Sequence, residues 1–340
     1  MSAFNAAFAG LDDEQRLGRY RRLAAAALAR YDLGSAEATF LGHNAGVAYR
    51  VQTAAGEPFV LKIAEPLGEG GWAPAGIAAA LAWLVALARE TDLVVQEPIP
   101  DRAGALLSGV AVDDLPEPFH CSLQRWVEGE RVGHFTPEHA RRIGAAVARL
   151  HRHGAAWVPP EPLAADEWEP EWVLARAGDL RAVVDLGILS PGEWATVEAA
   201  AARSDEVIAG LGRGPAAWGP IHGDLHHGNI LFHEGEVRMI DFGGLTRTHL
   251  AHDLGPALYH VMYQEVAVRR ALVESYAAAP GRGREGRARR SDPRPPRRES
   301  RHMAGHHRAA PADPHRRVRA ARDRLPHPLP GWRAPQLHDG

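Results

Sequence analysis

The sequence contains a single cysteine, Cys121, in 340 residues. One thiol excludes an internal disulfide and is typical of a reducing compartment, so we expect a cytoplasmic protein. Long hydrophobic runs are missing too: the most apolar stretch, residues 76–88, has 13 residues, whereas a membrane-spanning helix needs about 20. The N-terminal residues also lack the basic stretch and apolar core of a secretory signal. These absences predict a protein without a membrane partner.

Lysine is almost absent as well. Of the 39 lysine and arginine residues, only Lys62 is a lysine. Because arginine serves everywhere else, a lone lysine suggests a site that requires a compact ammonium group. Such a point charge can lie between two phosphates, whereas the guanidinium is a wider, planar fork. Chance survival of one lysine is the plain alternative.

The net charge of −3 hides two very different parts of the chain. Residues 1–280 hold 23 basic and 36 acidic residues, whereas residues 281–340 hold 16 arginines and 6 acidic residues. The last 60 residues also contain nine prolines and no isoleucine, phenylalanine or tyrosine. Such a composition cannot bury enough apolar surface to offset the entropy of ordering. Residues 281–340 are therefore predicted to be an Arg/Pro-rich, disordered tail with few packed contacts.

Three explanations compete for this tail. It is a basic arm that binds nucleic acid, a disordered extension without a function, or the product of a frameshift in a GC-rich gene. Arg, Pro, Ala and Gly have codons with G or C in both leading positions, and the composition changes abruptly near Pro280. The composition therefore favours the frameshift, and nucleic acid is not expected as a partner unless the tail is genuine.

The first part of the chain has the pattern of a small antiparallel sheet. Five segments are typical of strands: residues 40–41, 49–52, 58–63, 104–112 and 119–127. The first three surround a loop with Gly42 and Gly46, and Lys62 lies on the third. A helix is expected over residues 77–89. Glycine-flanked strands are weak evidence for a phosphate site, because a plain β-hairpin has the same pattern.

Beyond residue 133 the pattern becomes helical. Thr136 and Pro137 are typical of an N-cap followed by proline at the first helical position. Ser190 and Glu193 are spaced as a capping box. We expect three helices here: residues 137–154, 167–184 and 191–211. The sequence thus predicts an α+β fold with two lobes.

The densest group of polar side chains lies in the segment IHGDLHHGNILFHEGEVRMIDFGG. Residues 229–232 and 236–240 predict a hairpin that brings Asn229 and Asp241 to neighbouring strand ends. Amide and carboxylate oxygens side by side suit Mg²⁺, which completes its shell with phosphate and water. Asp224, in the preceding loop, is then free to accept a proton from an attacking hydroxyl, as phosphoryl transfer requires.

Two other interpretations fit parts of this segment. Polar residues between two strands also form plain solvated loops. Several histidines near an aspartate also hold Zn²⁺, as in a metal-dependent hydrolase. However, His226 and His227 are adjacent in the sequence, and neighbouring residues rarely point at one ion.

The segment resembles a known family. HGDLHHGN has the His-x-Asp-x-x-x-x-Asn spacing of a kinase catalytic loop, and IDFGG supplies an Asp-Phe-Gly element. The glycine after His222 makes it similar to the aminoglycoside phosphotransferase and choline kinase-like family. WVEGERV resembles that family's hinge, RRIGAAVARLH one of its helices and AHDLG its later aspartate. The resemblance covers roughly residues 37–275.

This resemblance implies a protein-kinase-like fold in which a small antiparallel-sheet lobe with one helix precedes a larger helical lobe. The implied boundaries are an N-terminal nucleotide-binding lobe, residues 1–127, a helical catalytic and substrate lobe, residues 128–280, and the tail. It also implies ATP and Mg²⁺ as cofactors. The implied activity is transfer of the γ-phosphate of ATP to a hydroxyl of a small molecule, such as an aminoglycoside, an amino alcohol or homoserine.

The family's roles carry over to individual residues. Asp224 corresponds to the catalytic base, Asn229 and Asp241 to the metal ligands, and His222 and Asp253 to structural supports of the loop. Six residues correspond to those that contact the nucleotide: Lys62, Gly42, Gly46, Gln124, Trp126 and Val127.

One family feature is missing. The helix after the lysine strand commonly carries a glutamate that pairs with the lysine, whereas this chain has alanine at its expected place, near Ala80. Glu69 or another acid would have to replace it. An unpaired lysine would be oriented less well, so a catalytically impaired, nucleotide-binding pseudokinase is the alternative function.

The acceptor site is expected against the helical lobe. Acidic and aromatic side chains suited to a cationic amine occur at the start of the second predicted helix: Glu167, Trp168, Glu169, Glu171 and Trp172. The plain alternative is that they begin a helix and complement its dipole.

Overall fold

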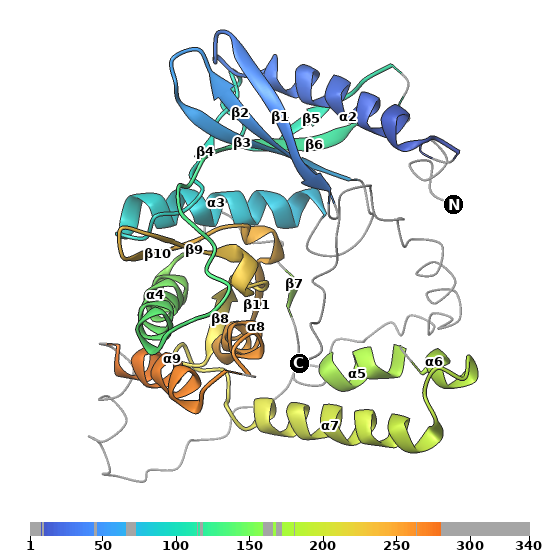
Figure 1. Cartoon of the computed structure of the whole chain (residues 1–340), viewed down its shortest axis with the longest axis vertical. Coiled ribbons are helices and arrows are strands. Elements are labelled where there is room, and N and C mark those ends of the chain that lie inside the picture. Colours follow the sequence, from blue (N-terminus) through green and yellow to red (C-terminus); the bar gives the residue numbers. More distant parts are fainter. Residues whose placement is uncertain are drawn as a thin grey trace, which may run out of the picture.

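The computed structural model describes residues 8, 10–43, 46–65, 73–113, 115, 118–158, 166–167, 172–179, 181–262 and 264–279. The predicted tail, Glu69, Trp168, Glu169 and Glu171 lie outside the described residues. Figure 1 shows a sheet with a covering helix at one end of the molecule, most helices at the other end and short strands between them.

Six strands form the large sheet, in the order β1-β2-β3-β6-β4 with β5 also paired to β6. Their bounds are β1 Ala36–His43, β2 Gly46–Thr53, β3 Pro58–Ala64, β4 Pro98–Ile99, β5 Ser108–Val110 and β6 Phe119–Arg125. Every pairing is antiparallel. The three strands predicted around the glycine loop are therefore confirmed, and Lys62 lies on β3 opposite Ala48 of β2 and Ser122 of β6.

Helix α2, Asp13–Leu28, covers one face of the sheet (Figure 1). It begins with a capping box in which Asp12 and Gln15 each accept a hydrogen bond from the other's backbone N–H. Its Tyr20 and Leu23 share a buried cluster with alternate side chains of β2. Only one helix was expected beside the sheet. The prediction missed α2 because its apolar face is largely alanine, which weakens the helical period.

Helix α3, Pro74–Glu90, is the predicted helix after the lysine strand. Its buried side chains, among them Trp83 and Leu87, share their core with the helical part of the molecule and not with α2. Trp83 contacts Phe242 edge-on, with 5.8 Å between ring centroids, and donates a hydrogen bond from Nε1 to His153 Nδ1 at 3.1 Å. The helix therefore joins the sheet end to the Asp-Phe-Gly segment.

The helical part contains α4 Pro137–Ala156, α5 Trp172–Asp179, α6 Ala182–Asp185, α7 Pro191–Ala209, α8 Leu254–Tyr259 and α9 Val266–Ala278. Thr136 and Ser190 cap α4 and α7 with capping boxes, as predicted. The single helix expected over residues 167–184 is wrong: α5 begins only after Pro170, and α6 is separate. Proline disfavours helical backbone in the residue before it, and Gly178 weakens the last turn of α5. None of the described helices has both the length and the apolar character needed to cross a membrane.

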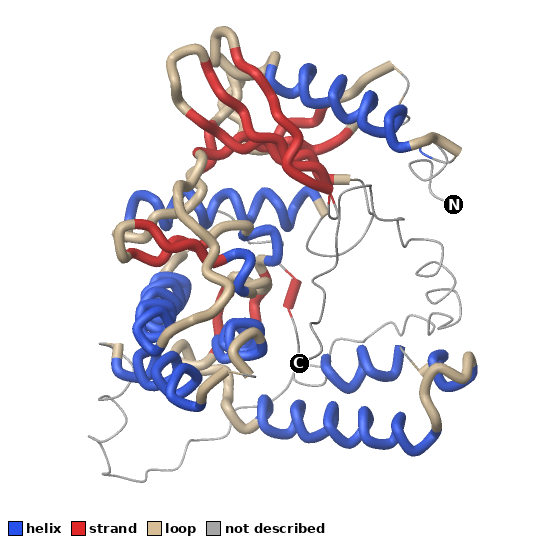
Figure 2. Tube along the Cα trace, in the orientation of Figure 1, coloured by secondary structure: helices blue, strands red, loops and turns tan. Residues whose placement is uncertain are grey.

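Short strands connect these parts (Figure 2). The predicted hairpin is confirmed as β9 Ile230–His233 and β10 Glu236–Met239. A second small sheet has the order β7-β11-β8, with bounds β7 Asp166–Glu167, β11 Thr246–His249 and β8 Trp218–Ile221. Single 3₁₀ turns follow these strands: η1 His227–Asn229, η2 Phe242–Gly244 and η3 Leu250–Asp253. His222, Asp224, Asn229, Asp241 and Asp253 of the predicted site lie on these turns and the loops beside them.

Helices α4 and α9 approach so closely at Gly144 that only glycine fits. A Cβ atom there would lie 2.3 Å from the Leu272 carbonyl oxygen. We expect Gly144→Ala to lower the free energy of unfolding by about 1–3 kcal/mol through overpacking. Gly18→Ala, in α2, is the matched control, because nothing lies within 4 Å of its Cβ position; it should stabilise by about 0.5–1 kcal/mol. Urea unfolding of both variants measures the difference, and equal midpoints would contradict this packing.

Candidate active site

The sheet and the hairpin bring Lys62 and Asp241 together. Lys62 Nζ lies 2.8 Å from Asp241 Oδ1, although the two residues are 179 positions apart. The positive charge of Lys62 is the main cause that holds the pKa of Asp241 below its usual range. Partial burial opposes this decrease, and the hydrogen bond from Lys62 lowers the pKa further. The only lysine of the chain is therefore paired with a carboxylate of the Asp-Phe-Gly element.

The backbone of Asp241 is held in an unusual conformation. Its φ of 66° and ψ of 60° are left-handed, a region that residues other than glycine seldom occupy and that is common at functional sites. The buried side chain of Gln96 supports this conformation, because its Oε1 accepts a hydrogen bond from the Asp241 N–H at 2.9 Å. Gln96 was not predicted from the sequence, since only the fold places it beside Asp241.

The loop before the hairpin holds Asp224 and Asn229 together. Asn229 Nδ2 donates to the Asp224 backbone oxygen at 2.9 Å and to its Oδ2 at 3.3 Å. The Ile240 N–H donates to the Asn229 carbonyl at 3.0 Å, which sets the residue before Asp241 against this loop. The structure thus places Asp224, Asn229 and Asp241 in adjoining segments, as predicted from the hairpin.

Two glycines let the loop of Asp224 cross the segment after Asp241. Gly223 has a φ of +81°, and a Cβ atom on it would lie 1.9 Å from the Gly244 carbonyl oxygen. A side chain at residue 223 would therefore push the two segments apart. The glycine after His222 is required for this close approach.

The donor set fits a hard divalent cation. Asp224 and Asp241 carry carboxylates with exposed area, and the Asn229 side-chain oxygen accepts no hydrogen bond from the described residues. Mg²⁺ prefers such oxygen ligands. No sulfur or nitrogen ligand is among these three side chains, so they suit Mg²⁺ better than Zn²⁺.

A buried hydrogen-bond network lies beneath the loop. Asp253, whose side chain is fully buried, accepts from the N–H groups of His222 and Gly223, both at 2.8 Å. Its Oδ2 also lies 3.0 Å from His151 Nε2, and His151 Nδ1 lies 2.7 Å from the Tyr276 hydroxyl. Burial alone would raise the pKa of Asp253, but the hydrogen bonds that it accepts and the nearby rings of His151 and His222 together hold it below its usual range.

His222 is fully buried beside this carboxylate. Its Nε2 lies 2.9 Å from the Ile240 carbonyl oxygen, and its Nδ1 accepts from the Asp224 N–H at 3.3 Å. His222 thus bridges the loop and the hairpin, the position expected of a structural support. Burial is the main cause that lowers its pKa, against the opposing charge of Asp253.

The buried state of His222 predicts a pH dependence of stability. Below about pH 6.5 the unfolded chain binds a proton at this histidine, whereas the folded chain resists it. The free energy of unfolding should therefore fall as pH decreases from 6.5, by at most about 1.4 kcal/mol per pH unit for each such histidine. Urea unfolding between pH 7.5 and 5.5 measures this slope, and His222→Asn should reduce it. A flat profile in the parent protein would contradict the buried, neutral state.

The predicted nucleotide-contacting residues lie on the large sheet and on the segment that follows β6. A Cβ atom on Gly46 would lie 2.6 Å from the Ile63 carbonyl oxygen, so strand packing by itself requires this glycine, whereas nothing lies within 4 Å of Gly42. The Gln124 side chain is buried in β6, and its Oε1 has no partner among the described residues. Trp126 and the buried Val127 come directly after β6. The same segment then reaches the hairpin, where Glu130 pairs with Phe232 of β9. Their contact with a nucleotide remains a prediction.

The missing glutamate leaves Asp241 as the partner of Lys62. Ala80 is buried on α3, and Lys62 forms no other ion pair with a described residue. Glu65, the nearest described acid along β3, instead accepts from the Tyr20 hydroxyl and lies 2.6 Å from His43 Nε2. The expected acceptor residue Glu167 is also engaged, because Arg247 Nε lies 3.2 Å from its Oε1.

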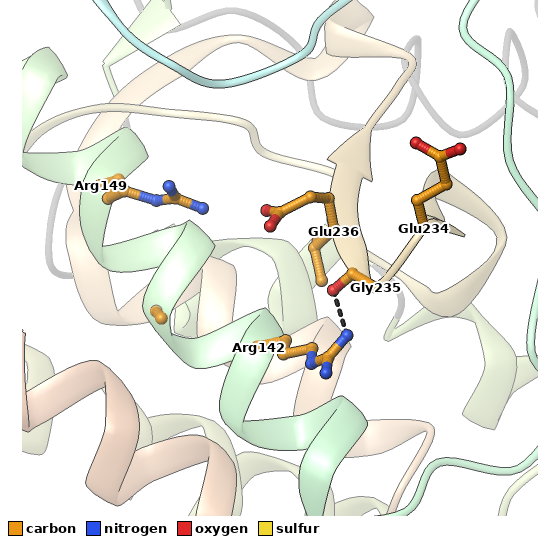
Figure 3. Close-up of a pocket in the computed structure, with 7 residues that line it drawn as sticks. Arg142, Arg149, Glu234, Gly235 and Glu236 are labelled. Atoms are coloured by element: carbon orange, nitrogen blue, oxygen red, sulfur yellow. Dashed lines mark hydrogen bonds between the residues drawn. The ribbon is translucent and has the colours of Figure 1, made fainter.

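A surface hollow of about 350 Å³ lies elsewhere, between α4 and the turn of the hairpin (Figure 3). Figure 3 shows Arg142 and Arg149 pointing from α4 toward this turn, where Arg142 donates to the Gly235 carbonyl. None of the predicted site residues lines the hollow. It is therefore separate from the candidate active site.

The sequence profile of the phosphotransferase enzyme family matches residues 37–291. The match covers most of the chain and includes every residue of the site described above. The chain belongs to this family. A protein of Deinococcus radiodurans is 31% identical over 186 residues, which are 54% of this chain and 52% of that protein. The chain therefore matches about half the length of this relative.

Solved structures share the fold. An amicoumacin kinase, in complex with AMP-PNP and Ca²⁺, superposes with a TM-score of 0.59 at 19% identity, covering 78% of this chain and 77% of the other. A microcompartment-associated aminopropanol kinase gives a TM-score of 0.58 at 22% identity, covering 78% and 91%. A macrolide 2′-phosphotransferase of Brachybacterium faecium gives 0.53 at 18% identity, covering 77% and 84%. The predicted two-lobed, protein-kinase-like α+β fold is confirmed.

Proposed function

We propose that this protein transfers the γ-phosphate of ATP to a hydroxyl group of a small molecule. The observation that carries the proposal is the 2.8 Å pair of Lys62 and Asp241, which joins the sheet to the segment that holds Asp224 and Asn229. A merely solvated loop would not require the chain's only lysine at that position. The lobe boundaries at residues 127 and 280 are part of the same proposal.

Asp224 is the proposed proton acceptor. The hydroxyl oxygen of the acceptor forms a bond to the γ-phosphorus, and the bond between that phosphorus and the β–γ bridging oxygen breaks. The hydroxyl proton passes to the Asp224 carboxylate, and ADP leaves with the bridging oxygen. Asn229 supports this role, because its amide group holds the Asp224 side chain and backbone in place.

Asn229 and Asp241 would hold Mg²⁺, and Lys62 would contact the phosphates. Bound Mg²⁺ would neutralise charge on the β- and γ-phosphate oxygens. Lys62 adds a compact positive charge next to them, and its bond to Asp241 orients it in the absence of a glutamate near residue 80 of α3. Gln124, Trp126 and Val127, with Gly42 and Gly46, would border the adenine and phosphates, while His222 and Asp253 support the loop.

A turnover assay tests this function. The full chain is incubated with Mg²⁺-ATP and a panel of aminoglycosides, amino alcohols, homoserine and macrolides, and ADP release is compared with the rate without acceptor. Acceptor-dependent ADP release together with a phosphorylated product supports the proposal. Nucleotide binding without turnover across the panel would favour the pseudokinase, for which the alanine at residue 80 is the supporting observation.

Replacing Lys62 by arginine should impair an active enzyme despite the conserved charge. The guanidinium is wider and donates in a plane, so it cannot occupy the same place between Asp241 and the phosphates. We expect kcat/KM to fall roughly tenfold or more. Arg89→Lys, at the exposed end of α3, is the control and should leave kcat/KM unchanged. Parent-like turnover of Lys62→Arg would show that the lysine is not used.

A further inference from the structure

Three histidine rings meet beside Asp224. His226 and His227 lie on the catalytic loop, and His260 follows α8. One nitrogen of each ring lies within 4.8 Å of the corresponding nitrogen of the other two. The rings of His227 and His260 are in contact, with centroids 4.0 Å apart. The tertiary fold therefore adds a third histidine to the adjacent pair.

The turn at the start of η1 lets the two adjacent histidines face the same region. His226 has extended backbone and caps the turn, with its Nδ1 accepting from the Gly228 N–H at 2.9 Å. This hydrogen bond leaves Nε2 of His226 available. His227 begins the turn, and its ring centroid lies 5.9 Å from that of His226. The objection that neighbouring residues diverge does not apply to this backbone.

His227 has a buried nitrogen with no described partner. Its Nδ1 is inaccessible to solvent and accepts or donates no hydrogen bond within the described part of the chain. Buried polar atoms are nearly always satisfied, so such an atom indicates a missing partner. A neutral imidazole nitrogen without a partner is the form of histidine that binds metals.

The geometry is close to that of a tetrahedral metal site. Imidazole nitrogens bound to Zn²⁺ at about 2.0–2.1 Å lie about 3.3 Å from each other. The nitrogens of this cluster all lie within 4.8 Å of one another, so they would have to approach by about 1.5 Å at most to share one ion. A fourth ligand is at hand, because Asp224 Oδ2 lies 3.7 Å from His226 Nε2.

We propose that His226, His227 and His260 form a binding site for a borderline-soft divalent cation such as Zn²⁺, with the Asp224 carboxylate as fourth ligand. This site is distinct from the oxygen ligands of Asn229 and Asp241, since imidazole nitrogens select Zn²⁺ over Mg²⁺. Its consequence rests on the proposed function. A Zn²⁺ ion that binds Asp224 withdraws the proton acceptor and so inhibits phosphoryl transfer.

The first test measures metal binding without ATP, on the full chain in excess Mg²⁺. Co²⁺ serves as a spectroscopic probe, because histidine ligands in a tetrahedral site intensify its visible absorption, and Zn²⁺ is then titrated to displace it. The chain has 19 histidines, so the measured quantity is the difference between the parent protein and its variants. His227→Ala and His260→Ala remove ligands, His260→Cys replaces one ligand by another, and exposed His134→Ala is the control.

The parent protein and the His134→Ala control should each bind one Zn²⁺ ion at this site. His227→Ala and His260→Ala should weaken this binding at least about tenfold, and His260→Cys should restore it. Equal Zn²⁺ affinity in the parent and in both alanine variants would overturn the site. Thermal melting of each variant shows whether it is folded, so a lost site is distinguished from a lost fold.

The second test measures inhibition. Zn²⁺ should inhibit turnover of the parent at concentrations that leave the His260→Ala variant much less affected. Zn²⁺ binding at the three histidines without any inhibition would overturn the fourth-ligand role of Asp224. If the chain has no phosphotransferase activity at all, the proposed function fails, while the spectroscopic titration still decides the metal site.

Discussion

Asp224→Asn should lower kcat by about 10²–10⁴-fold, the contribution of a positioned general base. Asparagine has nearly the same size and keeps a side-chain oxygen toward Asn229, so the loop should retain its structure. It cannot accept the proton of the attacking hydroxyl. The affinity for nucleotide should change little, because the proposed phosphate contact comes from Lys62 and the proposed Mg²⁺ ligands are Asn229 and Asp241. Steady-state kinetics and a nucleotide-binding titration on the same preparation measure both quantities.

Asp92→Asn is the control for this substitution. Asp92 forms a surface ion pair with Arg149 of α4. Its loss should leave kcat within about twofold, because surface pairs contribute little. Parent-like turnover in Asp224→Asn would show that Asp224 is not the proton acceptor. A loss of nucleotide affinity equal to the loss of kcat would instead assign Asp224 to binding.

Asp253→Ala should destabilise the protein more than the removal of any exposed carboxylate. The substitution leaves the N–H groups of His222 and Gly223 and the His151 ring without their common partner. We expect the free energy of unfolding to fall by about 3–5 kcal/mol. The melting temperature should then fall by about 2–4 °C for each kcal/mol. Differential scanning fluorimetry measures the shift.

Asp92→Ala serves as the control here as well, since an exposed ion pair is worth about 0–1 kcal/mol. Comparison of the two variants therefore distinguishes the stability contributed by a buried network from that contributed by a surface charge. A melting temperature of Asp253→Ala that matches that of Asp92→Ala would show that the network beneath the loop of Asp224 is not required for folding. It would also remove the argument that Asp253 supports the loop.

The described helical part leaves apolar side chains uncovered. Tyr259, Met262, Val266 and Val273, on or beside α8 and α9, are all more than a third exposed. Exposed apolar side chains of this kind are a liability for solubility. Whether the tail results from a frameshift stays a prediction. Resequencing the gene around the codons for residues 279–284 tests it.

The sequence determined those features that depend on near neighbours along the chain. Asp224, Asn229 and Asp241 come together because a short loop and a hairpin join them, so spacing alone predicted their proximity. The caps at Thr136 and Ser190 are likewise local, because an N-cap side chain bonds to a backbone N–H three residues away. The family resemblance was carried by the same local segment, and the profile match confirmed it.

Tertiary structure decided the partners of these residues. Lys62 meets Asp241, Gln96 holds the Asp241 backbone, His151 reaches Asp253, and His260 joins His226. These contacts connect positions separated by tens of residues or more, and no periodicity or spacing encodes them. They arise only when burial of the sheet, α3 and α4 brings distant segments together, because apolar packing and not local hydrogen bonding sets those distances.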